Sequence, residues 1–272
     1  MAAKPANPTS ERARPVALVT GASAGIGREM ATILASRGCD LVVVARREDR
    51  LVELKKRLAE AHGTRTMVIA EDLSHAAAPR RIVDEIRASG LEIEWLVNNA
   101  GYALNGRFMT NDWASHADFL QVMCTSWLHL THLLLPQMVR RGRGRVLNVS
   151  SLASLCPEPP GSLYAPAKCL MTSASRALRY DLLGTGVHCT ALCPGFTLTE
   201  FHDVLGNRET MNRLPRFMWQ DARTVCLAGV AGVERNRPVV VPGLFNRFAA
   251  AMCRALPYAV TSRMIPKGVM DR

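Results

Sequence analysis

Short apolar runs rich in β-branched residues alternate along the chain with longer segments whose apolar residues recur at helical spacing. The short runs indicate buried strands, and the longer segments indicate amphipathic helices. This alternation is typical of an α/β fold with a doubly wound parallel sheet and helices on both faces, in three α/β/α layers. The predicted strands cover residues 16–20, 40–45, 66–70, 94–97, 145–149, 187–192 and 239–241. The predicted helices cover residues 28–37, 48–62, 79–89, 113–139 and 164–183.

The pattern shows no repeat and no second core, so we expect one domain over residues 14–272. Residues 1–13 lack the apolar region of a signal peptide and are predicted to be a flexible lead-in. Residues 200–231 are expected to form a substrate-side flap. The C-terminal extension, residues 244–272, is apolar but interrupted by arginines and a proline. It can be a packed helix, a partner surface or a peripheral membrane contact, and the sequence leaves these open.

Composition narrows the function classes. The chain carries 34 Lys and Arg against 23 Asp and Glu, a formal charge of +11, which favours anionic partners such as nucleotide phosphates. Aromatic residues make up only 6% and do not interleave with a basic run, so nucleic-acid binding is not expected. The eight cysteines include no Cys-x-x-Cys pair, and the nearest candidate for a metal site, His129-x-x-His132, has no nearby Cys or carboxylate partner, so no metal site is predicted. Scattered apolar cysteines favour a reducing compartment, and we expect the cytoplasm.

A glycine-rich turn, TGASAGIG at residues 20–27, lies between a predicted strand and a predicted helix. That context is typical of a Rossmann-like dinucleotide site, where the helix N-terminus faces a pyrophosphate. Gly21 suits a tight turn, Gly25 allows backbone to approach the phosphates, and Gly27 allows close helix packing. We count Ser23 and Ile26 as further cofactor contacts.

The end of the second strand indicates which dinucleotide binds. It reads Val-Ala-Arg-Arg, with no carboxylate to accept from a ribose 2′-hydroxyl and with Arg46 and Arg47 instead. A guanidinium suits bidentate contact with a 2′-phosphate. NADP(H) is therefore the predicted cofactor, with Arg46 favoured over Arg47 and assisted by Ser23. The alternative is that both arginines point to solvent and do not select the cofactor.

Tyr164 and Lys168 are four residues apart and share a helix face, and Ser151 precedes Tyr164 by 13 residues, just after a predicted strand. With these residues the chain resembles the short-chain dehydrogenase/reductase (SDR) family. The matching segments are TGASAGIG, Asp72-Leu73, Asn-Asn-Ala-Gly at 98–101, Ser151 with Tyr-x-x-x-Lys, and PGFTLT at 194–199. They occur in family order over about residues 14–200.

The resemblance implies hydride transfer between nicotinamide and a carbonyl or alcohol. Tyr164 would be the proton donor and acceptor, its pKa lowered by the Lys168 ammonium, while Ser151 orients the carbonyl. Ser150 competes with Ser151 but has the wrong family spacing. Asp72 would contact the adenine and Asn98 would support the adenine ribose. The remaining expected cofactor contacts are Ala100, Gly101, Tyr164, Lys168, Pro194, Gly195, Thr197 and Thr199.

One position departs from the family pattern. Met123 stands where the family has a catalytic asparagine that helps hold a water of the proton relay. A thioether is a weak acceptor, so the resemblance implies an active but slow enzyme unless a backbone carbonyl or Thr125 keeps the relay. The alternative is an inactive NADP(H)-binding sensor or scaffold.

The substrate and the assembly are less constrained. Apolar side chains in the expected flap suggest an acyl, steroid-like or aromatic substrate, although they can equally pack internally. The resemblance implies a homodimer or homotetramer through the two long helices, residues 113–139 and 164–183.

Overall fold

The computed structural model of the chain describes residues 14–156, 163–201, 215–257 and 260. Its centre is a seven-stranded sheet in the order β3-β2-β1-β4-β5-β6-β9, and every neighbouring pair is parallel. The strands are β1 (Val16–Thr20), β2 (Asp40–Ala45), β3 (Thr66–Ala70), β4 (Ile93–Asn98), β5 (Gly144–Val149), β6 (Val187–Leu192) and β9 (Val239–Val240). The strand order reverses between β1 and β4, so this is the doubly wound Rossmann-like fold that the alternating pattern predicts.

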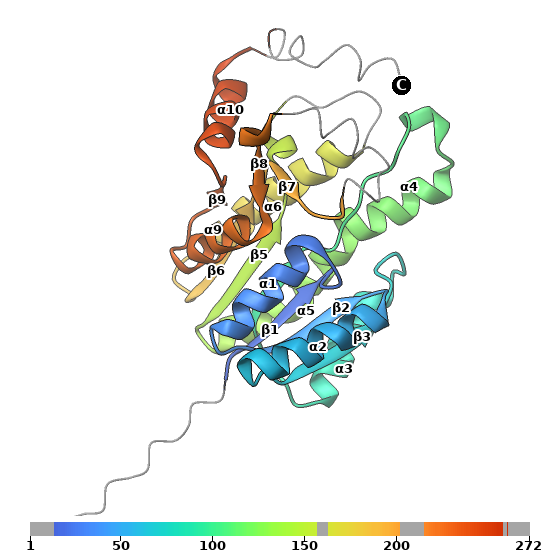
Figure 1. The fold of residues 1–272 in the computed structure, drawn as a ribbon, viewed down its shortest axis with the longest axis vertical. Helices are drawn as coiled ribbons and strands as arrows, with labels where there is room; N and C mark the ends of the chain where they lie inside the picture. Colours follow the sequence, from blue (N-terminus) through green and yellow to red (C-terminus); the bar gives the residue numbers. More distant parts are fainter. Residues whose placement is uncertain (1–13, 157–162, 202–214, 258–259, 261–272) are drawn as a thin grey trace, which may run out of the picture.

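Helices cover both faces of the sheet and complete the three layers (Figure 1). One face is covered by α1 (Gly25–Ser36), α2 (Glu48–His62) and α9 (Ala222–Glu234), which bury their apolar residues against β1, β2 and β5. The opposite face is covered by α3 (Ala78–Ala88), α5 (Trp127–Arg140) and α6 (Tyr164–Asp181). Strands buried on both faces read as continuous apolar runs rather than as alternating ones, which explains segments such as Leu-Val-Val-Val in β2.

Most predicted elements match the observed ones to within one or two residues. The exception at a boundary is α1, which begins at Gly25 inside the glycine turn rather than at residue 28. A pattern of apolar residues does not reveal this start, because two of the first three residues of the helix are glycines that carry no side chain to bury.

The predicted helix over residues 113–139 is interrupted. It consists of α4 (Trp113–Leu120), a π-helical turn η2 (Gln121–Ser126) and α5. A π turn inserts one residue into the helical ladder, and such turns occur frequently at functional sites. Met123 lies in this turn.

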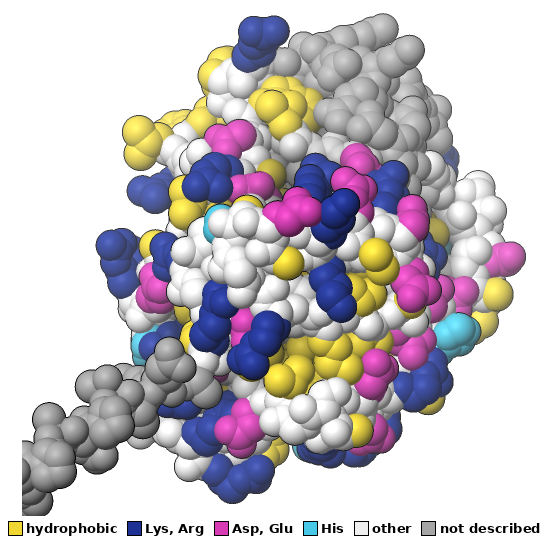
Figure 2. Space-filling view, turned by 60° about the horizontal axis from the view of Figure 1, so that its bottom comes forward, with side chains coloured by type: hydrophobic (Ala, Val, Ile, Leu, Met, Phe, Trp, Pro, Cys, Tyr) yellow, Lys and Arg dark blue, Asp and Glu magenta, His cyan; other side chains and the backbone are white. Residues whose placement is uncertain are grey.

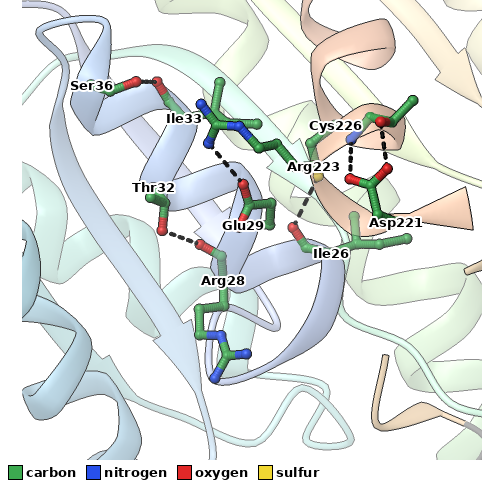
Figure 3. A network of polar contacts seen from close by, with 10 residues as sticks. Ile26, Arg28, Glu29, Thr32, Ile33, Ser36, Asp221, Arg223 and Cys226 are labelled. Carbon is green, nitrogen blue, oxygen red and sulfur yellow. Dashed lines mark hydrogen bonds and ion pairs between the residues drawn. The ribbon is translucent and has the colours of Figure 1, made fainter. Parts of the chain in front are cut away.

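The predicted flap, residues 200–231, is wrong in its second half. Residues 222–231 belong to α9, whose Val225, Cys226 and Val230 are completely buried in the core. Apart from Arg223 and Thr224 at its start and Glu234 at its end, this helix has only apolar or small residues on its exposed side as well, so helical spacing gives no clear signal there. Figure 3 shows how α9 is fixed to α1: Arg223 pairs with Glu29 at 3.2 Å, and the Cys226 thiol faces the Ile26 carbonyl at 3.5 Å.

Before α9 the chain forms β7 (Phe196–Leu198) and β8 (Trp219–Asp221), a two-stranded parallel sheet beyond the carboxyl end of the main sheet (Figure 1). After β9 it forms α10 (Leu244–Ala255). The predicted lead-in, residues 1–13, and much of the extension after α10 lie outside the described residues. In the described part of the chain, every helix is too short or too polar to cross a bilayer.

Charged side chains of both signs are interspersed on the face drawn in Figure 2, which does not gather its Lys and Arg into one stripe. Several form ion pairs between elements, including Arg81 with Glu71 and Arg37 with Glu234, both at 2.7 Å. Exposed pairs of this kind each contribute little to stability.

Candidate active site at the strand switch point

The carboxyl ends of β1 and β4 separate where the strand order reverses, and a hydroxyl joins them there. The Thr20 hydroxyl donates to the Val97 carbonyl at 3.3 Å and accepts from the backbone N–H groups of Asn99 and Ala100 at 3.0 and 3.1 Å. In open α/β sheets, ligands bind in the crevice at such a switch point. The glycine turn after β1 and the segment after β4 are therefore held side by side at the place where a ligand is expected.

The glycines of the turn fit a pyrophosphate. Gly21 and Gly25 have φ of 66° and 52°, the left-handed region that favours glycine. A side chain at Gly27 would collide with the Gly21 carbonyl, so its absence lets α1 pack directly under the turn. No side chain caps the N-terminus of α1, and its unpaired N–H groups are left for an anion.

Asn98 does not lie where its predicted role requires. It is 1% exposed, and its amide donates to Thr131 and to Asn148 inside the sheet core. The next residue, Asn99, reaches the glycine turn instead and donates to the carbonyls of Thr20 and Gly21 at 2.9 and 3.3 Å. Successive side chains along a strand point to opposite faces, which separates these two neighbours.

The two arginines after β2 have different partners. Arg46 is largely exposed and lies 3.7 Å from the carboxylate of Asp72, whereas Arg47 donates to the Ser23 hydroxyl at 3.1 Å. Burial alone would raise the pKa of Asp72, but hydrogen bonds from Ser74 and the charge of Arg46 hold it below its ordinary value. The sequence pairs Ser23 with Arg46, whereas the structure brings Ser23 to Arg47. Both guanidiniums flank the space beyond β2.

Glu200 is a charged residue at this edge that the sequence pattern does not identify. It follows β7 and pairs with Arg50 of α2 at 2.7 Å and with Arg47 at 3.6 Å. The hydrogen bond from Arg50 lowers the pKa of Glu200, so the carboxylate stays ionised. This ion pair ties the segment after β7 to the arginine side of the crevice.

Ser151, Tyr164 and Lys168 come together on the other side of the switch point. The Ser151 hydroxyl accepts from the Ala153 N–H at 3.1 Å and hydrogen-bonds the Tyr164 phenol. Ser150 turns away and bonds the Lys168 carbonyl and Thr172 in the interior. Of the two serines, Ser151 is the one that faces the phenol.

Lys168 is 4% exposed, and its ammonium donates to the Val149 carbonyl at 2.7 Å. Its Nζ lies 5.7 Å from the centre of the Tyr164 ring. The amine and the ring are thus one helical turn apart on α6, as the spacing of four predicts.

The sequence predicts that the Lys168 ammonium lowers the pKa of Tyr164. For the protein without a bound ligand, this prediction is wrong. Burial raises the pKa of Tyr164 to about 12, and the hydrogen bond with Ser151 offsets this only in part. Burial also lowers the pKa of Lys168 to about 8, against smaller opposing effects of Cys193 and Cys124. Desolvation disfavours the charged form of each group, so the phenol and the amine are both pushed toward neutrality.

Met123 occupies the interior beside this trio. It is 1% exposed and packs with Phe119 and Ala167, and its thioether accepts the Tyr102 N–H at 3.3 Å. Its backbone carbonyl, the group expected to keep a relay water, accepts the Trp127 indole N–H at 2.9 Å. The carbonyl therefore already has one donor.

The segment after β6 closes the site. The Pro194 carbonyl accepts from Leu152 at 2.7 Å, and the Thr197 hydroxyl is buried and donates to the Gly195 carbonyl. Thr199 lies against Gly25, so the glycine turn and the segment after β6 meet across the crevice. Of the two threonines, only Thr199 faces the glycine turn.

Asn246 of α10 is a supporting residue that sequence reasoning missed. It is 3% exposed, packs directly on Gly195, and donates to Gln220 and to the Pro242 carbonyl at 2.9 Å. A side chain at Gly195 would collide with it. The other strongly polar residues of this helix are arginines, so its single amide is the signal that could have indicated a buried hydrogen-bonding residue.

A doubly wound sheet with a glycine turn at its switch point defines a nucleotide-binding α/β protein, and comparison with known proteins specifies the family. The sequence profile of the short chain dehydrogenases matches residues 15–210. Sulfoacetaldehyde reductase 2 of Chromohalobacter salexigens is 33% identical over 188 residues, which cover 68% of this chain and 74% of that protein. The chain therefore belongs to the short-chain dehydrogenase/reductase family, a family of oxidoreductases.

Solved structures agree with this assignment. A short-chain dehydrogenase from Sphingobium yanoikuyae in complex with NADPH has a TM-score of 0.79 and 30% identity, covering 92% of this chain and 95% of that one. A short-chain dehydrogenase/reductase from Burkholderia phymatum in complex with NAD has a TM-score of 0.79 at 23% identity, covering 89% and 93%. The second likeness concerns the fold alone.

Proposed function

We propose that this protein is an NADP(H)-dependent oxidoreductase that interconverts a carbonyl and a secondary alcohol, with Ser151, Tyr164 and Lys168 as its catalytic residues. The observation that carries the proposal is the meeting of these three side chains beside a glycine turn that fits a pyrophosphate. When bound, the nicotinamide supplies the hydride to the carbonyl carbon.

The protein residues would handle the proton and the developing oxyanion. Tyr164, with a raised pKa, is a neutral phenol near pH 7 and is suited to protonate the oxygen of a carbonyl being reduced. The Ser151 hydroxyl, which accepts from Ala153 and hydrogen-bonds the Tyr164 phenol, would turn its proton to the same substrate oxygen when a carbonyl is bound. Lys168 would hold the nicotinamide ribose, as the family resemblance implies.

The preference for the phosphorylated dinucleotide rests on charge. The end of β2 has no carboxylate, and Arg46 and Arg47 flank the space beyond it. The relative from Sphingobium yanoikuyae was solved with NADPH, and the relative from Burkholderia phymatum with NAD. Because both cofactors occur on this fold, the arginines of this chain carry the assignment.

The substrate is proposed to be apolar. The ring of Phe201 lies 5.8 Å from the ring of Tyr164, and the partly buried ring of Trp219 packs on Phe196 behind it. The proposed flap is shortened to residues 200–221, since α9 belongs to the core; residues 202–214 of it lie outside the described part. An acyl, steroid-like or aromatic carbonyl would suit these surroundings.

The second candidate is an NADP(H)-binding sensor or scaffold with little catalysis, and Met123 favours it. Tyr164→Phe separates the two candidates in an NADPH-oxidation screen across ketones, ketoacyl thioesters and steroids. For an enzyme, the variant loses turnover by about 10²-fold or more while its NADPH dissociation constant stays within about twofold of wild type. Equal turnover in both proteins would remove Tyr164 from the mechanism, and the absence of turnover in both would favour the sensor.

We also propose a homodimer or homotetramer through α4, α5 and α6. Trp113, Leu170 and Tyr180 are large side chains on these helices that are 69%, 42% and 66% exposed. Such residues are candidates for burial by another subunit. Light scattering of the purified protein would test this, and a monomer at micromolar concentration would contradict it.

A cytoplasmic location is proposed, either in solution or peripheral at a membrane surface. The cysteines are free thiols, as in a reducing compartment, and α10 exposes Leu244 and Phe248 beside Arg247. Sedimentation with anionic vesicles would test the membrane contact. Leu244→Ser combined with Phe248→Ser should reduce any bound fraction, and an unchanged fraction would exclude α10 as the contact.

A further inference from the structure

Two thiols meet at the border between the candidate active site and the C-terminal helix. Cys156 follows the 3-10 turn η3 (Leu152–Leu155), which begins directly after Ser151, and Cys253 lies in the last turn of α10. The segments that carry them, η3 and α10, pack against each other, and Cys253 is near enough to contribute, with burial, to the raised pKa of Cys156. Both are partly buried free thiols, so they are near neighbours without being covalently joined.

The surrounding packing supports this contact independently. Leu155 and Arg254, the chain neighbours of the two cysteines, line one cavity of about 300 Å³. Helix α10 also packs against η3. Other cysteines have different partners: Cys193 contacts the Ser154 and Thr172 hydroxyls, and Cys189 contacts the Asn148 amide. Segments that are almost 100 residues apart in sequence thus bring two sulfur atoms together.

We propose that Cys156 and Cys253 are a redox modification site, which a low-molecular-weight disulfide such as glutathione disulfide converts to an intramolecular disulfide. Because Cys156 lies five residues after Ser151, the bridge would fasten α10 to the segment that leaves the candidate active site. The proposal does not depend on which substrate the protein reduces, or on whether it is an enzyme.

The reaction is a pair of thiol–disulfide exchanges. One cysteine thiol loses its proton, and the thiolate attacks a sulfur of glutathione disulfide, breaking that bond and releasing one glutathione thiolate. The second cysteine loses its proton and attacks the mixed disulfide, forming the Cys156–Cys253 bond and expelling the second glutathione. Two cysteine thiols are oxidised by two electrons, and one glutathione disulfide is reduced to two glutathione thiols.

Burial of Cys156 slows this exchange. Desolvation and the neighbouring Cys253 thiol raise the pKa of Cys156 to about 12, so its thiolate is scarce at neutral pH. Since the thiolate is the nucleophile, exchange should be slow at pH 7 and faster at pH 9. Bond formation must also bring the two sulfurs to about 2.05 Å, which requires α10 and η3 to shift against each other.

The test is mass mapping of the full chain. The reduced protein is incubated with glutathione disulfide at pH 8.5, free thiols are blocked with iodoacetamide, and the digest is analysed by mass spectrometry. We expect a linked peptide pair that contains Cys156 and Cys253, at least tenfold more abundant than any other cysteine pair. Dithiothreitol should return it to two alkylatable thiols.

Cys169→Ser is the matched control. Cys169 is also a partly buried thiol that lines the same cavity, and its thiol faces the Ser154 carbonyl at 3.5 Å. This variant should keep the link, whereas Cys253→Ser should leave Cys156 alkylated or carrying one glutathione. The proposal is overturned if wild-type Cys156 and Cys253 are both alkylated, if each carries a separate glutathione, or if either pairs preferentially with another cysteine.

Discussion

Replacing one glycine of the turn by alanine tests whether the crevice binds a pyrophosphate. Gly25 has φ of 52°, and a Cβ there would lie 3.1 Å from the Cβ of Thr199. Gly63, the C-cap of α2, has a similar φ of 60° but has nothing within 4 Å of the added carbon. The two positions therefore share the backbone strain and differ in what the methyl group meets.

The magnitudes follow from this difference. An alanine in the left-handed region costs about 1–2 kcal/mol. The smaller conformational entropy of the unfolded chain returns about 0.4–1 kcal/mol of this. Gly63→Ala should therefore lower the free energy of unfolding by about 1 kcal/mol and leave NADPH affinity unchanged. Gly25→Ala adds a methyl group between the turn and Thr199, so the two must move apart by a few tenths of an ångström. This shift of the turn should weaken NADPH binding by about tenfold or more, or about 1.4 kcal/mol.

The assay is a fluorescence titration with NADPH beside urea unfolding for wild type and both variants. The reasoning is refuted if the folded Gly25→Ala protein binds NADPH as tightly as wild type, because the added methyl group would then not disturb the bound dinucleotide. It is equally refuted if Gly63→Ala weakens binding, because backbone strain alone would then explain the loss.

Three further results are expected. Met123→Asn should raise kcat for an identified substrate severalfold, while Met123→Leu, which restores no polar group, should not; equal kcat in all three proteins would end the relay argument. Arg46→Ala and Arg47→Ala should each lower the NADPH/NADH ratio of kcat/KM by about tenfold, and an unchanged ratio in both would remove the arginines from cofactor choice. Because a lysine is charged below its pKa and that of Lys168 is about 8, kcat/KM for NADPH should fall above pH 8, well before Tyr164 ionises at about 12; a flat profile to pH 10 would contradict this.

The strands and the layer order could be predicted because a doubly covered parallel sheet requires continuous apolar strands separated by amphipathic helices. Helix α9 escaped prediction for a related reason. Between Thr224 and Glu234 its more exposed side consists of Leu227, Ala228 and Ala231, so no polar face marks the middle of the helix. Periodicity identifies a helix whose exposed face is polar, and it fails for one whose exposed face is apolar.

The roles of neighbouring residues were harder to separate. Asn98 and Asn99 are equivalent in the motif, yet one lies in the sheet core and the other braces the glycine turn. Arg46 and Arg47 diverge in the same way, toward Asp72 and toward Ser23. The local backbone conformation decides which of two adjacent side chains points into a site. A sequence motif gives the residue types but not this direction.

The pKa values of Tyr164 and Lys168 show a limit of a different kind. A spacing of four puts an amine near a phenol, and charge attraction alone then predicts an acidic phenol. The structure adds what the spacing omits: both groups are desolvated, and the Lys168 ammonium is satisfied by the Val149 carbonyl rather than by the phenolate. Desolvation of two opposite charges exceeds their attraction when they do not touch. In the protein alone, burial therefore pushes both the phenol and the amine toward their neutral forms.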